Sequence, residues 1–143
     1  NFTSMVNGAS SGIKNIEIVR FNGAATATFR SDQFGAGLLV DNLTIRGAGG
    51  VQNFVVNMVS GATTLNMLSW QFSLWTGGTD LITVNGSTGN DTIIVSSQHT
   101  IFDGGAGSDT VDYSSWGGGF TLTLNTSNWV NAVWNSGLFD TFR

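Results

Sequence analysis

Asp91 and Asp109 are the side chains of this sequence best suited to bind a ligand by their own chemistry. Each closes a short glycine-rich stretch, GSTGND at residues 86–91 and GGAGSD at residues 104–109. Glycine lets a turn curl until backbone carbonyls point inward, and carboxylate and carbonyl oxygens are the ligands that calcium prefers. The two stretches therefore predict turns that hold a hard divalent cation.

These stretches belong to a repeat with a period of nine residues. In register, residues 86–94 read GSTGNDTII, residues 95–103 read VSSQHTIFD, and residues 104–112 read GGAGSDTVD. The third unit fits G-G-x-G-x-D-x-U-x, where U is apolar, at every specified position, and this pattern is a signature of calcium-binding β-helices. The apolar positions that recur in step, and are expected to point into a core, are Ile93, Phe102 and Val111.

Over residues 86–113 the repeat resembles the repeats-in-toxin family of secreted proteins, whose nonapeptides wind into a parallel β-roll. The resemblance implies six residues of turn and three of strand in each unit, so that residues 18 apart stack on one side of the roll. It also implies a calcium ion between the two stacked turns, with Asp91 and Asp109 as acidic ligands. The other members of the implied site are the turn residues Gly86, Thr88, Gly105 and Gly107.

The middle unit departs from the pattern, because Val95, Gln98 and Thr100 stand where the family has Gly, Gly and Asp. We therefore expect no matching calcium site on the opposite side of the roll. Asp80 or Asp103 is a candidate to help bind a second ion. Two charged ligands in an exposed setting predict a modest affinity, with a Kd on the order of 0.1 to 1 mM.

A second interpretation of the two aspartates involves no metal. Carboxylates in glycine-rich loops commonly accept hydrogen bonds from nearby backbone N–H groups, so Asp91 and Asp109 are also candidates for capping their own turns. At the ninth position of the repeat, Asp103 and Asp112 are expected to be solvated or to stabilise turns.

Residues suited to catalysis are sparse. The chain has no cysteine, and its one histidine, His99, falls in the middle unit, where a surface turn is expected. Without a second histidine or an HExxH pattern, the sequence offers neither a zinc protease site nor a familiar nucleophile–base pair. The remaining route to catalysis is glycosidase-like chemistry by aspartates that folding brings together. We expect a protein that is not an enzyme.

The composition limits the partners. Only 10% of the 143 residues are charged, there are 20 glycines and no proline, and the formal net charge is −4. No lysine or arginine occurs between residues 47 and 142, which argues against nucleic acid as a partner. The sequence has no run of about 18 apolar residues that would cross a membrane. A small secreted domain without disulfides needs another source of stability, and a bound calcium ion is one.

Short apolar or alternating stretches separated by Gly, Asn and Ser indicate an all-β chain. Within residues 65–75, Leu68, Trp70, Phe72 and Leu74 alternate with polar residues, which predicts one strand with these four side chains buried. Strands are expected at residues 15–21, 25–29, 38–45, 51–59, 65–75, 81–84, 92–95, 100–102, 110–113 and 120–125.

The expected architecture is a right-handed parallel β-roll or β-helix solenoid, in which an irregular β cap could close the C-terminus. Residues 1–76 are expected to form a β-rich solenoid or sandwich-like region, and residues 77–125 the calcium-binding β-roll. Residues 126–143 would form the cap or a connection to a following region. All three ranges are expected to make one continuous domain.

The expected function is that of a secreted, calcium-stabilised structural module at the cell surface, used in a surface layer, a filament or a larger exported protein. Its expected partners are copies of itself or other surface proteins. The alternatives are an adhesin-type module that binds glycans and the non-catalytic tail of a secreted hydrolase. The candidates for a glycan-binding or assembly surface are Trp116, Trp129 and Trp134, because aromatic side chains suit both kinds of contact.

Overall fold

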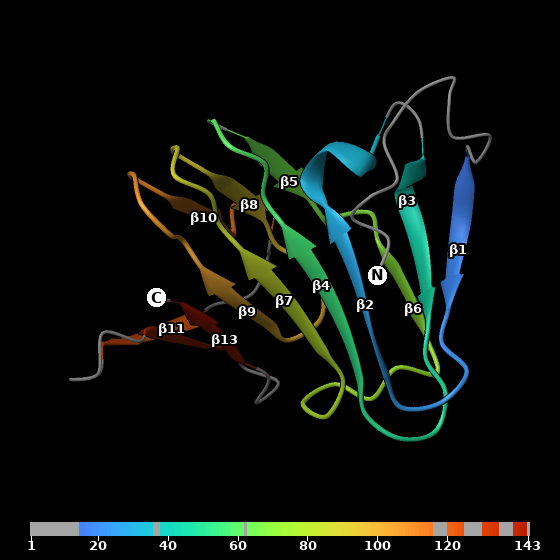
Figure 1. Ribbon diagram of the computed structural model, residues 1–143. Coiled ribbons are helices and arrows are strands. Elements are labelled where there is room, and N and C mark those ends of the chain that lie inside the picture. Colours follow the sequence, from blue (N-terminus) through green and yellow to red (C-terminus); the bar gives the residue numbers. More distant parts are fainter. Residues whose placement is uncertain are drawn as a thin grey trace.

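The computed structural model describes residues 15–35, 38–61 and 63–115, together with three later strands at residues 120–124, 130–134 and 139–142. In this part of the chain the regular structure is all β-strand, apart from one turn of 3-10 helix (Figure 1). The expected all-β class is therefore confirmed. None of the described residues form a helix with the length and apolar character to cross a lipid bilayer.

Most of the strands are short, and the connections between consecutive strands from β1 to β10 have four to eight residues. In chain order they are β1 (Ile16–Arg20), β2 (Ala25–Arg30), the 3-10 helix η1 (Ser31–Gln33), β3 (Leu39–Arg46), β4 (Gln52–Asn57), β5 (Thr64–Asn66), β6 (Gln71–Ser73), β7 (Leu81–Asn85), β8 (Thr92–Ile94), β9 (Thr100–Asp103), β10 (Thr110–Asp112), β11 (Phe120–Leu124), β12 (Val130–Trp134) and β13 (Phe139–Phe142).

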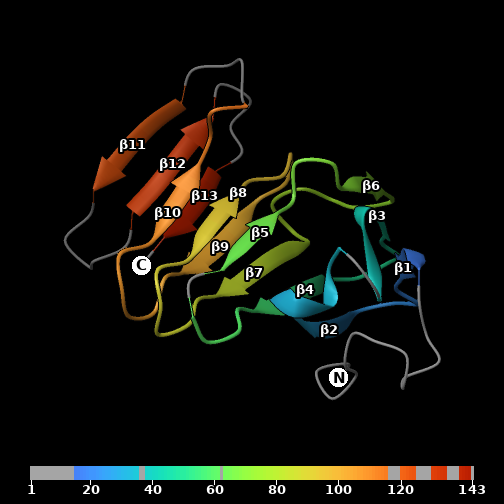
Figure 2. The same ribbon diagram turned by 90° about the horizontal axis from the view of Figure 1, so that it is seen from above.

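The strands form three sheets, and the chain changes sheet at every step from β1 to β10. The largest has the order β11-β12-β13-β9-β7-β4-β2, and the others are β1-β3-β6 and β10-β8-β5. Figures 1 and 2 show β2, β4, β7 and β9 side by side as one layer. Buried side chains of all three sheets belong to one hydrophobic core. Parallel strands need a crossover connection between them. Here each crossover between parallel neighbours contains a strand of another sheet.

We call the segment of chain from one residue to its parallel partner a circuit. The length of this circuit changes along the protein. Paired residues are 28 apart between β4 and β7 and between β5 and β8. They are only 18 apart between β7 and β9 and between β8 and β10. The longer circuit from β4 to β7 contains three strands, whereas the shorter circuit from β7 to β9 contains two. The circuits therefore become shorter towards the glycine-rich turns.

An aromatic cluster fills the part of the core within the longer circuits. Phe54 on β4 has no exposed surface, and its ring stacks on Phe29 of β2 with centroids 4.9 Å apart. Trp70 packs edge-on against Phe54 at 5.4 Å, and Phe34 stacks on Trp70 at 5.2 Å. Because side chains alternate along each strand, these inward residues alternate with outward polar residues such as Asn53.

The stretch at residues 65–75 is not one strand, so that prediction was wrong. The chain turns between β5 and β6, where the backbone N–H of Trp70 donates to the Met67 carbonyl over 3.1 Å. β5 pairs with β8, whereas β6 pairs with β3 in another sheet. Trp70 is buried and Phe72 packs on the core, but Leu68 and Leu74 are 45% and 64% exposed. Alternation is a local signal, and the turn shifts its phase.

The C-terminal strands extend the largest sheet in a different manner. β11, β12 and β13 pair antiparallel, and β13 then pairs in parallel with β9. β12 and β13 were not among the strands expected from the sequence. Strands from residues 1–76, 77–125 and 126–143 consequently all contribute to the seven-stranded sheet.

The aromatic cluster predicts a large penalty for Phe54→Ala. Removing a fully buried ring that packs with three other rings should lower the free energy of unfolding by about 3 to 5 kcal/mol. Val55→Ala is the matched control, since Val55 is the next residue on β4 and faces outward, and it should cost about 1 kcal/mol or less. Urea unfolding of both variants measures the difference, and equal losses would contradict the assignment of the core face.

Candidate functional site

The two glycine-rich turns lie one above the other. β8 and β10 pair in parallel, with Thr92 opposite Thr110. The Asp91 N–H donates to Asp109 Oδ1 over 2.9 Å, and the Thr110 N–H donates to the Asp91 carbonyl over 2.8 Å. Asp91 and Asp109 therefore lie on the same side of the molecule, one circuit apart.

Glycine is required in these turns because their backbones approach so closely. A Cβ atom on Gly86 would overlap the carbonyl oxygen of Gly104, and one on Gly105 would overlap the carbonyl oxygen of Ser87. Gly105 and Gly107 also have positive φ angles of 79° and 123°, which other residues rarely adopt. Backbone oxygens of one turn thus lie directly against the other turn.

Asp91 is fully buried and both of its carboxylate oxygens accept hydrogen bonds. Oδ2 accepts from the Ser87 N–H, four residues earlier in its own turn, over 2.6 Å. Oδ1 accepts from the Thr63 hydroxyl, one circuit earlier, over 2.8 Å. The capping role considered from the sequence is therefore present at Asp91, whereas the bond described for Asp109 comes from the Asp91 N–H in the other turn. A carboxylate has about four acceptor positions, so these two bonds do not exhaust it.

Two further buried aspartates make bonds of the same kind on the seven-stranded sheet. Asp80 accepts from the Thr76 N–H, four residues earlier, at 2.6 Å and from the Gln52 N–H, one circuit earlier, at 2.9 Å. Asp140 accepts from the Thr100 N–H at 2.6 Å. We call Asp80, Asp91, Asp109 and Asp140 the aspartate clips, because each carboxylate bonds a backbone or side-chain donor in the preceding circuit of the stack.

The sequence contains a local signal for one more of the clips, Asp80. Asp80 ends the stretch TGGTD, much as Asp91 ends STGND and Asp109 ends GAGSD. In each case the aspartate closes a short turn and directly precedes a strand. Asp140 is the second residue of β13 and so does not directly precede a strand, unlike the other three aspartates.

The site residues Gly86, Gly105 and Gly107 lie at the contact between the two turns, and Thr88 is exposed in the first turn. Asp103 and Asp112 act at turns, as expected. Asp103 Oδ1 accepts from the Gly105 N–H at 3.2 Å, and Asp112 Oδ1 accepts from the Ser114 N–H at 2.7 Å. Bonds from the Ser114 hydroxyl and N–H lower the pKa of Asp112.

His99 is buried, with 6% of its surface exposed, so the expectation of a surface turn was wrong. Ser96 and Thr100, on either side of it, are buried as well. Directly after His99, β9 pairs with β13, and Asp140 of β13 accepts a hydrogen bond from the Thr100 N–H. Burial lowers the pKa of His99, which favours the neutral imidazole.

The aromatic residues proposed as a glycan or assembly surface receive no structural description. Trp116 and Trp129 lie outside the described residues, and Trp134 belongs to β12, of whose side chains nothing is described.

Among the described residues, no three histidine or acidic side chains gather into a group that could hold a metal ion. A calcium ion between the stacked turns would therefore depend on two carboxylates and on backbone carbonyl oxygens. No protein-family model, curated protein or solved structure matches this chain.

Asp140 should give the protein a measurable pH dependence. Burial raises the pKa of its carboxyl to about 6, although bonds from the Tyr113 hydroxyl and the Thr100 N–H oppose the shift. In the unfolded chain the carboxyl titrates near 3.8. Between these values the native state holds a proton that the unfolded state has released, so this contribution to stability is complete below about pH 4 and is lost as the pH rises through about 6.

We expect the free energy of unfolding of the wild type to fall, relative to Asp140→Asn, by about 3 kcal/mol between pH 4 and pH 7. Urea unfolding of both proteins at several pH values isolates this term, because all other groups are shared. Parallel stability curves for the two proteins would show that Asp140 does not titrate in this range.

Proposed function

We propose that this chain is a non-catalytic structural module, a right-handed parallel β-solenoid whose circuits are held in register by the aspartate clips. Support comes from parallel strands paired one circuit apart in every sheet. The right-handed sense follows from the general rule for parallel strands joined by a crossover, which about 98% of such connections obey. The clip carboxylates accept hydrogen bonds from N–H and O–H donors, and this suits a structural role better than acid–base chemistry.

The two stacked turns bind calcium in this proposal, as in the repeats-in-toxin proteins that residues 86–113 resemble. The observation that carries it is the 2.9 Å bond from the Asp91 N–H to Asp109 Oδ1, which brings two acidic turns together. Carbonyl oxygens of the same turns, such as those of Ser87 and Gly104, lie between them. The ligands come from turns one circuit apart, so calcium would bind the folded chain and stabilise it.

The proposed setting is outside the cell, at its surface, because a weak site of this kind fills only where calcium is abundant. Copies of the chain are the proposed partners. β2, β1 and β10 each end a sheet among the described strands, and a terminal strand presents backbone N–H and C=O groups that a further strand can use. Addition of copies at such edges would build a filament or a layer.

Calcium should raise the melting temperature of the wild type. A concentration ten times the Kd adds about 1.4 kcal/mol of stability, which corresponds to roughly 3 to 6 °C for a domain of this size. Asp109→Ala should melt at a lower temperature than the wild type and show no calcium response. Calorimetric melting in calcium and in excess chelator measures both effects.

Asp80→Ala is the matched control, since Asp80 makes the same kind of clip away from the two glycine-rich turns. It should lose stability through its unbonded N–H groups, yet keep the calcium response of the site between the two stacked turns. A melt of the wild type that is identical in calcium and in chelator would leave the clips as purely structural and remove calcium from the proposal.

A further inference from the structure

Arg20 and Arg46 lie side by side on adjacent parallel strands. β1 and β3 pair with Arg20 directly opposite Arg46, one residue after the pair of Val19 and Ile45. Ile45 is fully buried and Val19 packs on the core. Side chains alternate along a strand, so both arginines point to the outer face, with their strands about 4.8 Å apart. Arg20 is exposed and Arg46 is half-buried.

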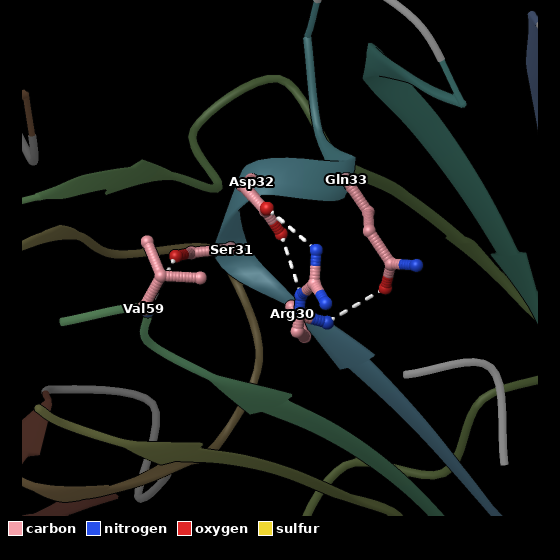
Figure 3. A network of polar contacts seen from close by, with 5 residues as sticks. All are labelled: Arg30, Ser31, Asp32, Gln33 and Val59. Atoms are coloured by element: carbon pink, nitrogen blue, oxygen red, sulfur yellow. Dashed lines mark hydrogen bonds and ion pairs between the residues drawn. The ribbon is translucent and has the colours of Figure 1, made fainter. Parts of the chain in front are cut away.

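No carboxylate neutralises this pair among the residues that the structure describes. The ion pair found there joins Arg30 to Asp32 at 2.7 Å, and Figure 3 shows the Arg30 guanidinium bonded to both oxygens of Asp32. Like charges directly opposite each other on neighbouring strands destabilise a sheet. Two of the five cations of an acidic chain therefore stand where they repel each other.

Uncharged polar side chains continue the surface beside the two arginines. Ser73 of β6 pairs with Arg46 and extends the row across a third strand. The next row along the same strands is formed by Ile18, Thr44 and Gln71, of which Ile18 is 54% exposed. The face thus offers two guanidinium groups, two hydroxyls, an amide and an aliphatic side chain.

We propose that this face of β1, β3 and β6 binds an acidic polysaccharide, with Arg20 and Arg46 together holding one carboxylate or sulfate group. A guanidinium bonds such groups through two parallel N–H donors, and a shared anion would relieve the repulsion between the arginines. The hydroxyls of Thr44 and Ser73 and the amide of Gln71 then bond sugar hydroxyls. An exposed aliphatic side chain such as Ile18 suits the apolar face of a sugar ring.

The charge distribution favours this ligand over nucleic acid. Nucleic-acid binding draws on several neutralised phosphates, whereas this face has two arginines on a chain of net charge −4. A polysaccharide with one anionic group per sugar unit, separated by neutral hydroxyls, fits two cations and a polar surround. The site lies on β1, β3 and β6, and the proposed calcium turns flank β8 and β10, so each proposal can fail without the other.

The test measures binding of the folded wild-type chain to immobilised polygalacturonate, dextran sulfate and neutral dextran. We expect binding to one of the two acidic polymers, and the polymer that binds identifies carboxylate or sulfate as the recognised group. Arg20→Gln and Arg46→Gln should each weaken this binding by about 10- to 100-fold, as expected for loss of a charged hydrogen bond. Arg30→Gln is the matched control and should change it less than about twofold, because Arg30 is already paired with Asp32.

Several results would overturn the proposal. They are equal binding by all three variants and the wild type, equal binding to neutral dextran, or tighter binding to duplex DNA than to either acidic polymer. Thermal melting without polymer supplies an independent readout of the repulsion. Arg46→Gln should melt at or above the temperature of the wild type, and a clearly lower melting temperature would mean that Arg46 serves the fold and not a ligand.

Discussion

The hydrogen bond from a donor in one circuit to a buried aspartate in the next is the interaction on which this fold depends. Strands of three to five residues form few ladder bonds, and the turns between them leave backbone N–H groups that no strand accepts. Asp80, Asp91 and Asp140 supply acceptors at these places while almost entirely excluded from water. A buried N–H group without an acceptor lowers the free energy of unfolding by about 1 to 3 kcal/mol. These carboxylates therefore fix the alignment of each circuit on the one before it.

The shortening of the circuits changes the interactions that hold neighbouring circuits together. Circuits of 28 residues enclose an aromatic cluster around Phe54, whereas circuits of 18 residues bury smaller sets that include Ile93 and Val84. Less apolar area per circuit means a weaker hydrophobic contribution at the end with the shorter circuits. The glycine-rich turns lie at that end, where backbone contacts and, as we propose, calcium compensate for the smaller core.

The charged groups are divided between two tasks in different parts of the molecule. The buried acids act on the backbone and hold the circuits together, while Arg20 and Arg46 remain on an outer face without a carboxylate beside them in the described part of the chain. In a protein with so few charges, each task falls to a few residues. A structural role for the clips and a binding role for the arginine pair are therefore compatible.

Composition and spacing were enough to predict the all-β class and the nine-residue period, because both are local properties of the chain. The stacking of Asp91 on Asp109 was implied by the resemblance of residues 86–113 to the repeats-in-toxin family, and the two residues do lie one circuit apart. The folded structure was needed to show the division of residues 65–75 between two sheets, the burial of His99 and the distant donors that bond Asp80 and Asp140. Those features depend on contacts between residues 27 to 40 positions apart, and no local periodicity reports such contacts.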